Sequence, residues 1–348
     1  LIYDAKNQPE AAFALLDIFE SFAARPWSML LDSAEAIHPN SRYQIMVAEP
    51  LATLVSQHGK TTLTDEQGAH HYTTDPFTVL DCALKRYFPE KKTSELPFSG
   101  GALGYFAYDL GRYLETIPSH AKQDLHLPDM AVGLYRWALI FDQHTQQLWC
   151  FDYHGDAELQ WHNIQHRMQA KSSAITPFSL TSTWLANMTK PEYQQKFNRV
   201  QDELAQGNCY QINLAQRFNA SYQGDEWQAY KLLREKNAAP FSAFLRLEQH
   251  AVLSISPERF ISLHDRHIET KPIKGTRPRG FCAITDQIHA DELQHSAKDR
   301  AENVMIVDLL RNDIGKVSAP GSVQVPSLFA IESFPAVHHL VSTVTGTL

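Results

Sequence analysis

Four short runs early in the chain alternate between apolar and polar side chains. They cover residues 43–48, 51–56, 60–64 and 69–73. Alternation with a period of two is typical of β-strands that bury one face. Gly59 and Gly68 separate the last three runs and supply the backbone freedom that tight turns need. We therefore predict an antiparallel meander in this part of the chain.

The composition is that of an ordinary soluble globular protein. The 348 residues allow two domains or one large one, with 43% hydrophobic and 20% charged residues. No window holds about 18 uninterrupted apolar residues, so we expect no membrane span. A formal net charge of -8 without a long Lys/Arg run argues against a nucleic-acid partner. The four cysteines are far apart, form no CxxC pair and predict reduced thiols in a cytoplasmic protein.

Glycines and a polar stretch mark further features. The run 99–107, Ser-Gly-Gly-Ala-Leu-Gly-Tyr-Phe-Ala, predicts a strand on which another backbone packs closely. Its glycines do not match a dinucleotide-binding GxGxxG motif. Residues 171–183 are rich in Ser and Thr and predict a linker. We accordingly expect an N-terminal region, 1–183, and a second region, 184–348.

The second half begins with a strong helix start. Thr189 as N-cap with Glu192 three residues later predicts a helix that ends near Gly207. Residues 209–218 then alternate like a strand, with Gln211 on its amide-rich face. Such a face lies either in solvent, which the sequence slightly favours, or along a polar pocket.

Residues 271–280, Lys-Pro-Ile-Lys-Gly-Thr-Arg-Pro-Arg-Gly, hold four cations among two glycines and two prolines. We expect a rigid turn that follows a strand and suits a small anion. The other cations would favour the neutral amine of Lys274, and a neutral amine is a nucleophile. Charge alone favours the alternative of a solvated basic loop.

Two glutamates each have a functional and a structural interpretation. Glu258 lies at a predicted strand end, where functional side chains are common, but it could instead pair with Arg259 at the surface. Glu302 lies in a helix predicted over 296–311 with Ser296 as N-cap, and a single helical glutamate is usually a surface residue.

Five motifs occur together in a specific order. They are Asn-Cys-Tyr-Gln-Ile-Asn-Leu-Ala-Gln (208–216), Ser-Pro-Glu-Arg-Phe (256–260), Pro-Ile-Lys-Gly-Thr-Arg-Pro-Arg-Gly (272–280), Lys-Asp-Arg-Ala-Glu-Asn with Val-Asp-Leu-Leu-Arg-Asn-Asp (298–313), and Ala-Val-His-His-Leu-Val-Ser (336–342). The whole chain resembles the chorismate-utilising enzymes, which include anthranilate, isochorismate and aminodeoxychorismate synthases. The resemblance implies an α+β fold, a large two-sheet sandwich flanked by helices with chorismate between the sheets.

The resemblance also implies a reaction. Glu258 would be the general acid that protonates the C4 hydroxyl of chorismate. Lys274 would attack ring carbon C2 as that hydroxyl leaves, and ammonia would then attack C4 and expel the lysine. The product would be 4-amino-4-deoxychorismate, a precursor of 4-aminobenzoate and folate. The chain has no Gly-x-Cys-x-Gly elbow, so a glutamine amidotransferase partner would supply the ammonia.

Two positions distinguish the branches of the family. Anthranilate synthases carry Ala where this chain has Lys274. Members that add water carry a lysine base where this chain has Gln211, because water needs a base and ammonia already has its lone pair. Lys274 favours amination at C4 over anthranilate synthesis, and Gln211 argues against the water-adding branch. The alternatives are the first component of an anthranilate synthase and a non-catalytic fragment that binds tryptophan or a partner.

The remaining implied sites are one for magnesium and two for organic ligands. Glu302 matches a magnesium ligand, and Mg²⁺ needs few protein carboxylates. The residues that match substrate-pocket positions are Gln211, Thr276 and His339. The residues that match a tryptophan pocket are Ser33, Asn40, Ser41, Arg42, Tyr43, Pro240, Phe241 and Ser242. The family continues well beyond the position of Leu348, so we expect a fragment that lacks its C-terminal part and is incomplete as a catalyst.

Overall fold

The computed structural model describes residues 2–4, 15–34, 41–92, 94–120, 124–169 and 176–348. The chain packs into two units, which are treated separately below. The first contains residues 1–172 and 230–348, and the second contains residues 173–229. These units are defined by packing, so the expected division at 183/184 stays a prediction. No helix among the described residues is long and apolar enough to cross a membrane.

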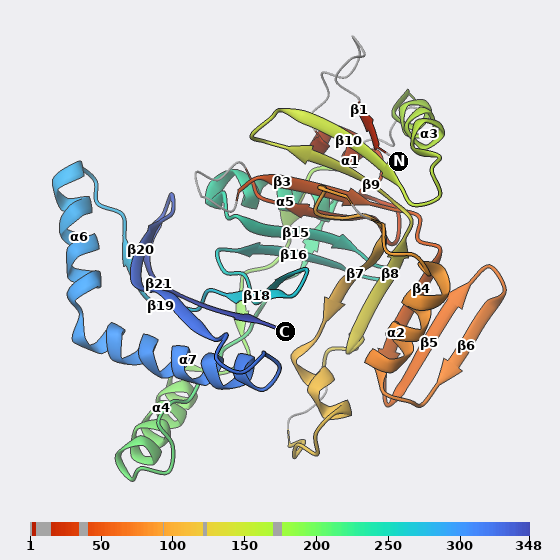
Figure 1. Ribbon diagram of the computed structural model, residues 1–348. Coiled ribbons are helices and arrows are strands. Elements are labelled where there is room, and N and C mark those ends of the chain that lie inside the picture. The colour runs from red at the N-terminus through yellow and green to blue at the C-terminus, as the bar shows by residue number, and fades with distance from the viewer. Residues whose placement is uncertain (1, 5–14, 35–40, 93, 121–123, 170–175) are drawn as a thin grey trace. The chain divides into compact units, whose positions relative to one another are not determined.

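Many of the helices and strands are labelled in Figure 1. The helices are α1 (Leu15–Glu20), α2 (Pro76–Tyr87), the 3-10 helix η2 (Tyr108–Tyr113), α3 (Ala157–Gln169), α4 (Lys190–Ala205), α5 (Glu226–Asn237), α6 (Ala283–His295) and α7 (Ala297–Gly315). The strands are β1 (Ile2–Asp4), β2 (Met29–Asp32), β3 (Tyr43–Val47), β4 (Ala52–Gln57), β5 (Lys60–Asp65), β6 (Gly68–Tyr72), β7 (Gly101–Phe106), β8 (Met130–Tyr135), β9 (Trp137–Asp142), β10 (Gln147–Asp152), β11 (Ser179–Leu180), β12 (Leu185–Ala186), β13 (Phe218–Asn219), β14 (Tyr222–Gln223), β15 (Phe241–Arg246), β16 (Ala251–Ser256), β17 (Ser262–His264), β18 (His267–Thr270), β19 (Ile273–Pro278), β20 (Gln324–Ser333) and β21 (Val337–Thr347).

Two antiparallel sheets of the first unit share one apolar core. The seven-stranded sheet has the order β1-β10-β9-β3-β2-β15-β16, and the five-stranded sheet has the order β6-β5-β4-β8-β7. Met29 and Ile140 of the first sheet belong to one buried cluster with Leu103 and Tyr135 of the second. The expected two-sheet packing of an α+β fold is therefore present, because each sheet buries one face against the other.

The predicted meander is correct for its last three runs only. Strands β4, β5 and β6 pair in sequence, but β3 pairs with β2 and β9 in the other sheet. The break comes at Glu49, whose φ of 54° turns the chain ahead of Pro50. Alternation predicts strands without naming their partners, so it could not show this change of sheet.

The glycine-bearing strand packs as its composition predicts. A Cβ on Gly104 of β7 would lie 2.0 Å from the carbonyl oxygen of Ala131 on the neighbouring strand β8. No side chain fits at this position. The expectation of a close backbone approach within 99–107 is confirmed.

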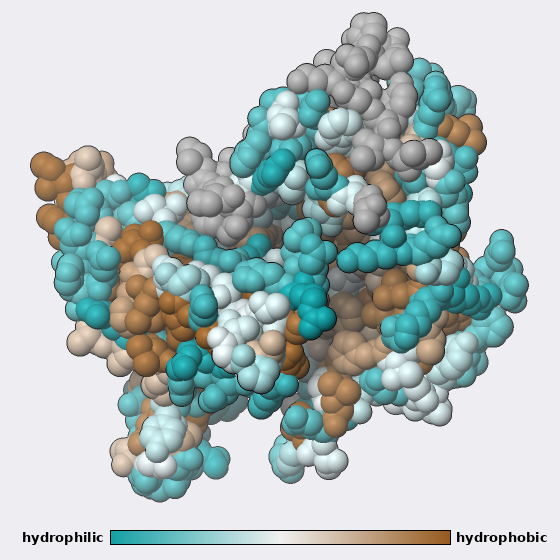
Figure 2. Space-filling model, viewed as in Figure 1, coloured by the Kyte–Doolittle hydropathy of each residue, from teal (hydrophilic) through white to brown (hydrophobic). Residues whose placement is uncertain are grey.

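A third sheet carries most of the motifs from the second half of the chain. Its order is β17-β18-β21-β19, and β20 also pairs with β21. Helices α6 and α7 pack against β19, β20 and β21 (Figure 1). Near the start of α6, Phe281 and Ile284 are exposed, and apolar surface is visible at this end of the helix (Figure 2).

The basic segment is a strand with a bulge and not the expected turn. Residues 273–278 form β19, and its pairing with β21 shifts by one residue between Ile273 and Thr276. Gly275 has a φ of 96° at this irregularity. Proline and glycine favoured a turn in the sequence, but an edge strand tolerates Pro278, and a bulge uses the glycine.

Helix α7 starts where the sequence predicts and runs slightly further. The Ser296 hydroxyl accepts a hydrogen bond from the backbone N–H of Asp299, which makes Ser296 the N-cap. The fully buried Asn303 then joins the helix to β21. Its amide donates to the Leu340 carbonyl (3.2 Å), and the Ser342 hydroxyl donates to its side-chain oxygen (2.6 Å).

The second unit confirms one prediction and contradicts another. Thr189 and Glu192 form the predicted capping box of α4. Residues 209–217 form no strand, and only β13 at the end of the predicted run pairs, with β12. Tyr210 is 86% exposed. A strand needs a paired neighbour, and among the described residues strand pairing along this run begins only at Phe218.

A buried ion pair stabilises the centre of the seven-stranded sheet. The Asp32 carboxylate at the end of β2 accepts hydrogen bonds from Arg234 Nε (2.6 Å), Tyr230 Oη (3.0 Å) and Gln44 Nε2 (3.0 Å). The N–H of Ala34 donates to the same carboxylate (2.7 Å), while Ala34 adopts a φ of 50°. The four groups together satisfy a charge that would otherwise be costly to bury.

Replacing Asp32 by Ala should lower the free energy of unfolding by about 3–5 kcal/mol, because Arg234 would stay buried without its partner. The matched control is Asp81→Ala, which breaks the exposed helical pair with Lys85 and should cost no more than about 0.5 kcal/mol. Urea unfolding of both variants measures the difference. Equal costs would contradict a stabilising role for the buried pair.

Candidate active site

The structure brings Glu258 to the start of β19, the strand that carries Lys274. Glu258 lies in the loop after β16, and its Oε1 accepts a hydrogen bond from the backbone N–H of Ile273 at 3.0 Å. Ile273 precedes Lys274 on β19. The Glu258 side chain is exposed and therefore accessible to a ligand. The predicted acid and the predicted nucleophile therefore share one part of the third sheet.

The bulge in β19 determines how Lys274 is presented. Lys274 and Gly275 together oppose Leu340 of β21, because Ile273 pairs with Val341 and Thr276 with His339. A Cβ on Gly275 would lie 2.9 Å from the Asp299 Cβ of α7. Glycine is therefore required here both by its positive φ and by the close approach of α7.

The other three cations of the basic segment are each paired with a carboxylate. Lys271 pairs with Glu332, Arg277 with Asp299 at 2.9 Å, and Arg279 with Asp286 at 2.6 Å. These pairs cancel the local positive charge that the sequence predicted around Lys274. The unpaired positive charge expected on the cations that flank Lys274 is therefore not found. Within the described part of the chain, the half-buried Lys274 ammonium itself has no hydrogen-bond or ion-pair partner.

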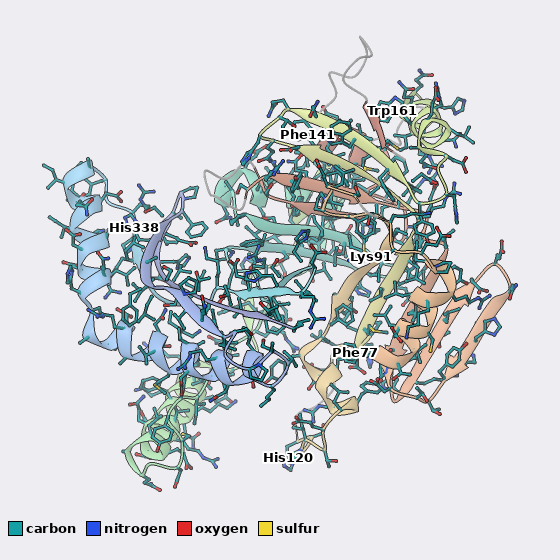
Figure 3. The ribbon with its side chains drawn as sticks, viewed as in Figure 1. Phe77, Lys91, His120, Phe141, Trp161 and His338 are labelled. Carbon is teal, nitrogen blue, oxygen red and sulfur yellow. The ribbon has the colours of Figure 1, made fainter. Side chains whose placement is uncertain are left out.

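One of these carboxylates, Asp286, has several hydrogen-bond partners. The Arg279 guanidinium, with the N–H of Gly280, holds the pKa of Asp286 well below its ordinary range. Asp286 Oδ1 also lies 2.9 Å from Nε2 of the buried His338, whose Nδ1 lies 2.8 Å from Ser333 Oγ. Figure 3 labels His338 on β21. These contacts join α6 to β20 and β21, which gives His338 a structural role.

His339 and Thr276 form the second contact of the candidate site. Thr276 Oγ1 lies 2.9 Å from His339 Nδ1, on paired positions of β19 and β21. Burial lowers the pKa of His339, and a hydrogen bond with the Gly275 backbone and the nearby Glu332 carboxylate offset only part of that effect. A neutral imidazole beside a hydroxyl can donate or accept a hydrogen bond, which suits recognition of a polar substrate group.

Glu302 is half-buried on α7, next to the Asn303 that joins this helix to β21. Among the described residues, no group of three or more His, Cys, Asp or Glu side chains could hold a metal ion. Magnesium often takes only one or two protein carboxylates and keeps several waters. A single carboxylate at Glu302 therefore fits as one ligand of such an ion.

The predicted tryptophan-pocket residues meet at one end of three neighbouring strands. Strand β2 runs antiparallel to both β3 and β15, so its end lies beside the starts of the other two. Ser33 Oγ donates to the Tyr43 carbonyl at 2.9 Å, and Ser242 pairs with Asp32. The Ser41 hydroxyl is buried and has no hydrogen-bond partner among the described residues.

The other predicted residues of this pocket have distinct positions. Pro240 and Phe241 lie at the start of β15, buried and half-buried respectively. The Arg42 guanidinium pairs with Asp142 at 2.8 Å. Asn40 lies outside the described residues. Gln211, predicted for the substrate pocket, belongs to the second unit.

Some residues of this site were not identified from the sequence. One of them is Asp32, the buried acceptor beside Ser33. Asp299 shapes the bulge at Gly275, and Thr270 holds the Glu258 loop through a hydrogen bond to the Phe260 carbonyl (2.6 Å). Only the motif context could have indicated Asp299, and no local pattern indicated Thr270.

Known proteins of one family are similar to this chain. A family model described as chorismate binding enzyme matches residues 28–348. Aminodeoxychorismate synthase component 1 of Salmonella typhimurium is 53% identical over 325 residues, 93% of this chain and 70% of the relative. Anthranilate synthase component 1 of Geobacillus stearothermophilus is 33% identical over 345 residues, 92% of this chain and 68% of the relative.

A solved structure shares the fold. The crystal structure of anthranilate synthase component I from Streptococcus pneumoniae TIGR4 superposes with a TM-score of 0.78 at 26% identity. The match covers 89% of this chain and 70% of that one. The α+β fold predicted from the motifs is thereby confirmed.

Replacing Gly275 by Ala should destabilise the bulge in two ways. A left-handed φ costs a β-carbon about 1–2 kcal/mol, and crowding against Asp299 adds about 1–3 kcal/mol. Gly59→Ala is the matched control, because Gly59 has a φ of 75° but nothing within 4 Å of an added Cβ. Chemical denaturation should show a larger loss for Gly275→Ala. Equal losses would mean that contact with α7 does not constrain the bulge.

Proposed function

The chain belongs to the family of chorismate-binding enzymes, and on this basis we propose that it catalyses the reaction of component 1 of an aminodeoxychorismate synthase. This reaction converts chorismate and ammonia to 4-amino-4-deoxychorismate. Similarity favours it over anthranilate synthesis, since the Salmonella relative is 53% identical and the anthranilate synthase from Geobacillus only 33%. The observation that carries the proposal is the hydrogen bond from the Ile273 N–H to the Glu258 carboxylate, because Ile273 directly precedes Lys274 on β19.

We assign Glu258 as the general acid. The C4 hydroxyl of chorismate is a poor leaving group unless it is protonated as the C–O bond breaks. The carboxyl of Glu258 would supply that proton and release water. Its exposure and its fixed position beside β19 support this role.

We assign Lys274 as the covalent nucleophile. Its neutral amine would form a bond to C2 while the ring double bonds shift and the C4 oxygen leaves as water. Ammonia would then form the C4–N bond, shift the double bonds back and release the lysine amine. An ammonium without a partner among the described residues can lose its proton without breaking an ion pair.

Substrate orientation falls to Thr276 and His339. The paired hydroxyl and imidazole offer neutral polar groups on the same sheet as Lys274. Glu302 would hold a magnesium ion, and such an ion would neutralise a carboxylate of the substrate. Ammonia would come from a glutamine amidotransferase subunit, because the relatives are named as a first component. The four cysteines are all free thiols, which suits a cytoplasmic enzyme.

We also propose that L-tryptophan binds beside the ends of β2, β3 and β15. The pocket would comprise Ser33, Ser41 and Tyr43 on one side and Phe241 and Ser242 on the other. The buried hydroxyl of Ser41 without a described partner supports a polar ligand there. Phe241 offers an aromatic face for the indole ring.

Incubation with chorismate and magnesium, without ammonia, should give an adduct on Lys274. Its mass should be that of chorismate less one water, as measured by peptide mass spectrometry. Lys274→Ala should lose the adduct and at least about 1000-fold in rate, since the covalent route would be closed. The matched control, Lys298→Ala on the exposed surface of α7, should keep both. Aminodeoxychorismate formed at the wild-type rate by Lys274→Ala would exclude the covalent route.

Calorimetric titration should show L-tryptophan binding to the wild-type protein. Phe241→Ala should weaken this binding by roughly 10-fold, because an aromatic pair contributes about 0.5–1.5 kcal/mol beyond its buried area. Phe281→Ala, at a 94% exposed position, should leave it unchanged. Titration with D-tryptophan tests whether the polar groups of the pocket recognise the α-amino and α-carboxylate groups of the ligand. If titration with L-tryptophan gives no heat of binding, the proposed tryptophan pocket is refuted.

A further inference from the structure

The loop that carries Glu258 has no backbone ladder of its own. Residues 257–261 connect β16 to β17, and the β17–β18 pairing begins only at Ser262 with Glu269. An unpaired loop would leave a general acid free to move over several ångströms. Something other than sheet pairing must therefore hold Glu258 in place.

Three consecutive residues of this loop are tethered to the adjoining strands. The Glu258 carboxylate accepts from Ile273 N–H, Arg259 pairs with Glu269, and the Phe260 carbonyl accepts from the Thr270 hydroxyl. The Ser256 hydroxyl adds a local bond to the Glu258 carbonyl at 2.9 Å. The tethers run from the loop to β18 and to β19, and Lys274 lies on β19.

Among these tethers, the Thr270 bond is the most rigid. Thr270 is 5% exposed and its bond to the Phe260 carbonyl is 2.6 Å long. Its backbone pairs with Val344 of β21. Its strand, β18, lies between β17 and β21 in the sheet. A β-branched side chain on a central strand has little rotamer freedom. Glu258 and Arg259, by contrast, are tethered by long side chains that lie partly in solvent.

We propose that Thr270 is a positioning residue for the reaction, which sets the distance between the Glu258 carboxyl and the Lys274 amine. Thr270 fixes the Phe260 carbonyl, and this holds the loop so that Glu258 reaches Ile273 N–H. The residue touches neither substrate nor the reacting atoms. This inference rests on the proposed function, since it assumes that Glu258 acts as the acid.

The test compares three variants of the full protein. Thr270→Val removes the hydroxyl at nearly constant shape and should lower kcat about 10- to 100-fold, with KM within about threefold, because small misplacement of a catalytic group is costly. Thr270→Ser keeps the hydroxyl and should restore kcat to within about threefold of wild type. Thr343→Val is the matched control, a buried threonine on β21 of the same sheet, and should keep its activity.

A double-mutant cycle shows whether Thr270 acts through Glu258. In a Glu258→Gln background, Thr270→Val should cause no further loss of kcat, since the acid is already absent. Hydrogen exchange at the Ile273 amide, followed by fragmentation mass spectrometry, gives a readout without turnover. That exchange should become several-fold faster in Thr270→Val and stay unchanged in Thr343→Val. If Thr270→Val does not fold, Glu269→Gln loosens the neighbouring tether and should show the same two changes at smaller size.

The outcomes separate the two proposals. Wild-type protein that makes no aminodeoxychorismate refutes the proposed function, and the exchange rate of the Ile273 amide then decides whether Thr270 holds the loop. Wild-type kcat in Thr270→Val, or additive losses in the double-mutant cycle, would overturn the positioning role. Loss of folded protein with unchanged kcat per folded molecule would show that Thr270 is only structural.

Discussion

The pairing of β19 with β21 is the interaction on which the candidate site depends. It aligns Thr276 with His339 and leaves one extra residue between Ile273 and Thr276. Successive strand residues point to opposite faces, so removing that residue would turn Thr276 away from His339. The positive φ of Gly275 and the close approach of Asp299 allow the bulge to exist. The orientation of the site therefore follows from one glycine and its neighbour on α7.

Most of the cations on and beside β19 have a structural role. Lys271, Arg277 and Arg279 each pair with a carboxylate from β20, α7 or α6. These pairs hold two helices and a strand against β19. Lys274 differs from them, because its ammonium has no partner among the described residues. A segment that reads as uniformly basic therefore contains three structural cations and one cation available for reaction.

Much of the local structure followed from local patterns. The capping box at Thr189, the N-cap at Ser296 and the close backbone approach at Gly104 depend on residues near in sequence or on steric size. Alternation correctly predicted the four strands β3, β4, β5 and β6. It did not predict that β3 leaves the meander, since alternation shows which face is buried but not which strand is adjacent.

The wrong predictions have a common physical cause. Residues 209–217 have a strand-like pattern, but a strand forms only with a hydrogen-bonded partner. Residues 271–280 have turn-like residues, but their place beside β21 makes them a bulged edge strand. In the basic segment, pairing with a strand distant in sequence outweighs the local preference for a turn. In residues 209–217, the lack of a paired strand outweighs the local preference for a strand.

The sequence by itself determined the family, the order of the motifs and the chemical types of residue that the reaction needs, because these are properties of short ordered segments. Only the tertiary structure decided that most of the basic segment is a strand, that its flanking cations are paired, and that Glu258 is hydrogen-bonded to Ile273, the residue before Lys274. These features arise from hydrogen bonds and ion pairs between elements whose separation in the chain carries no information about their separation in space.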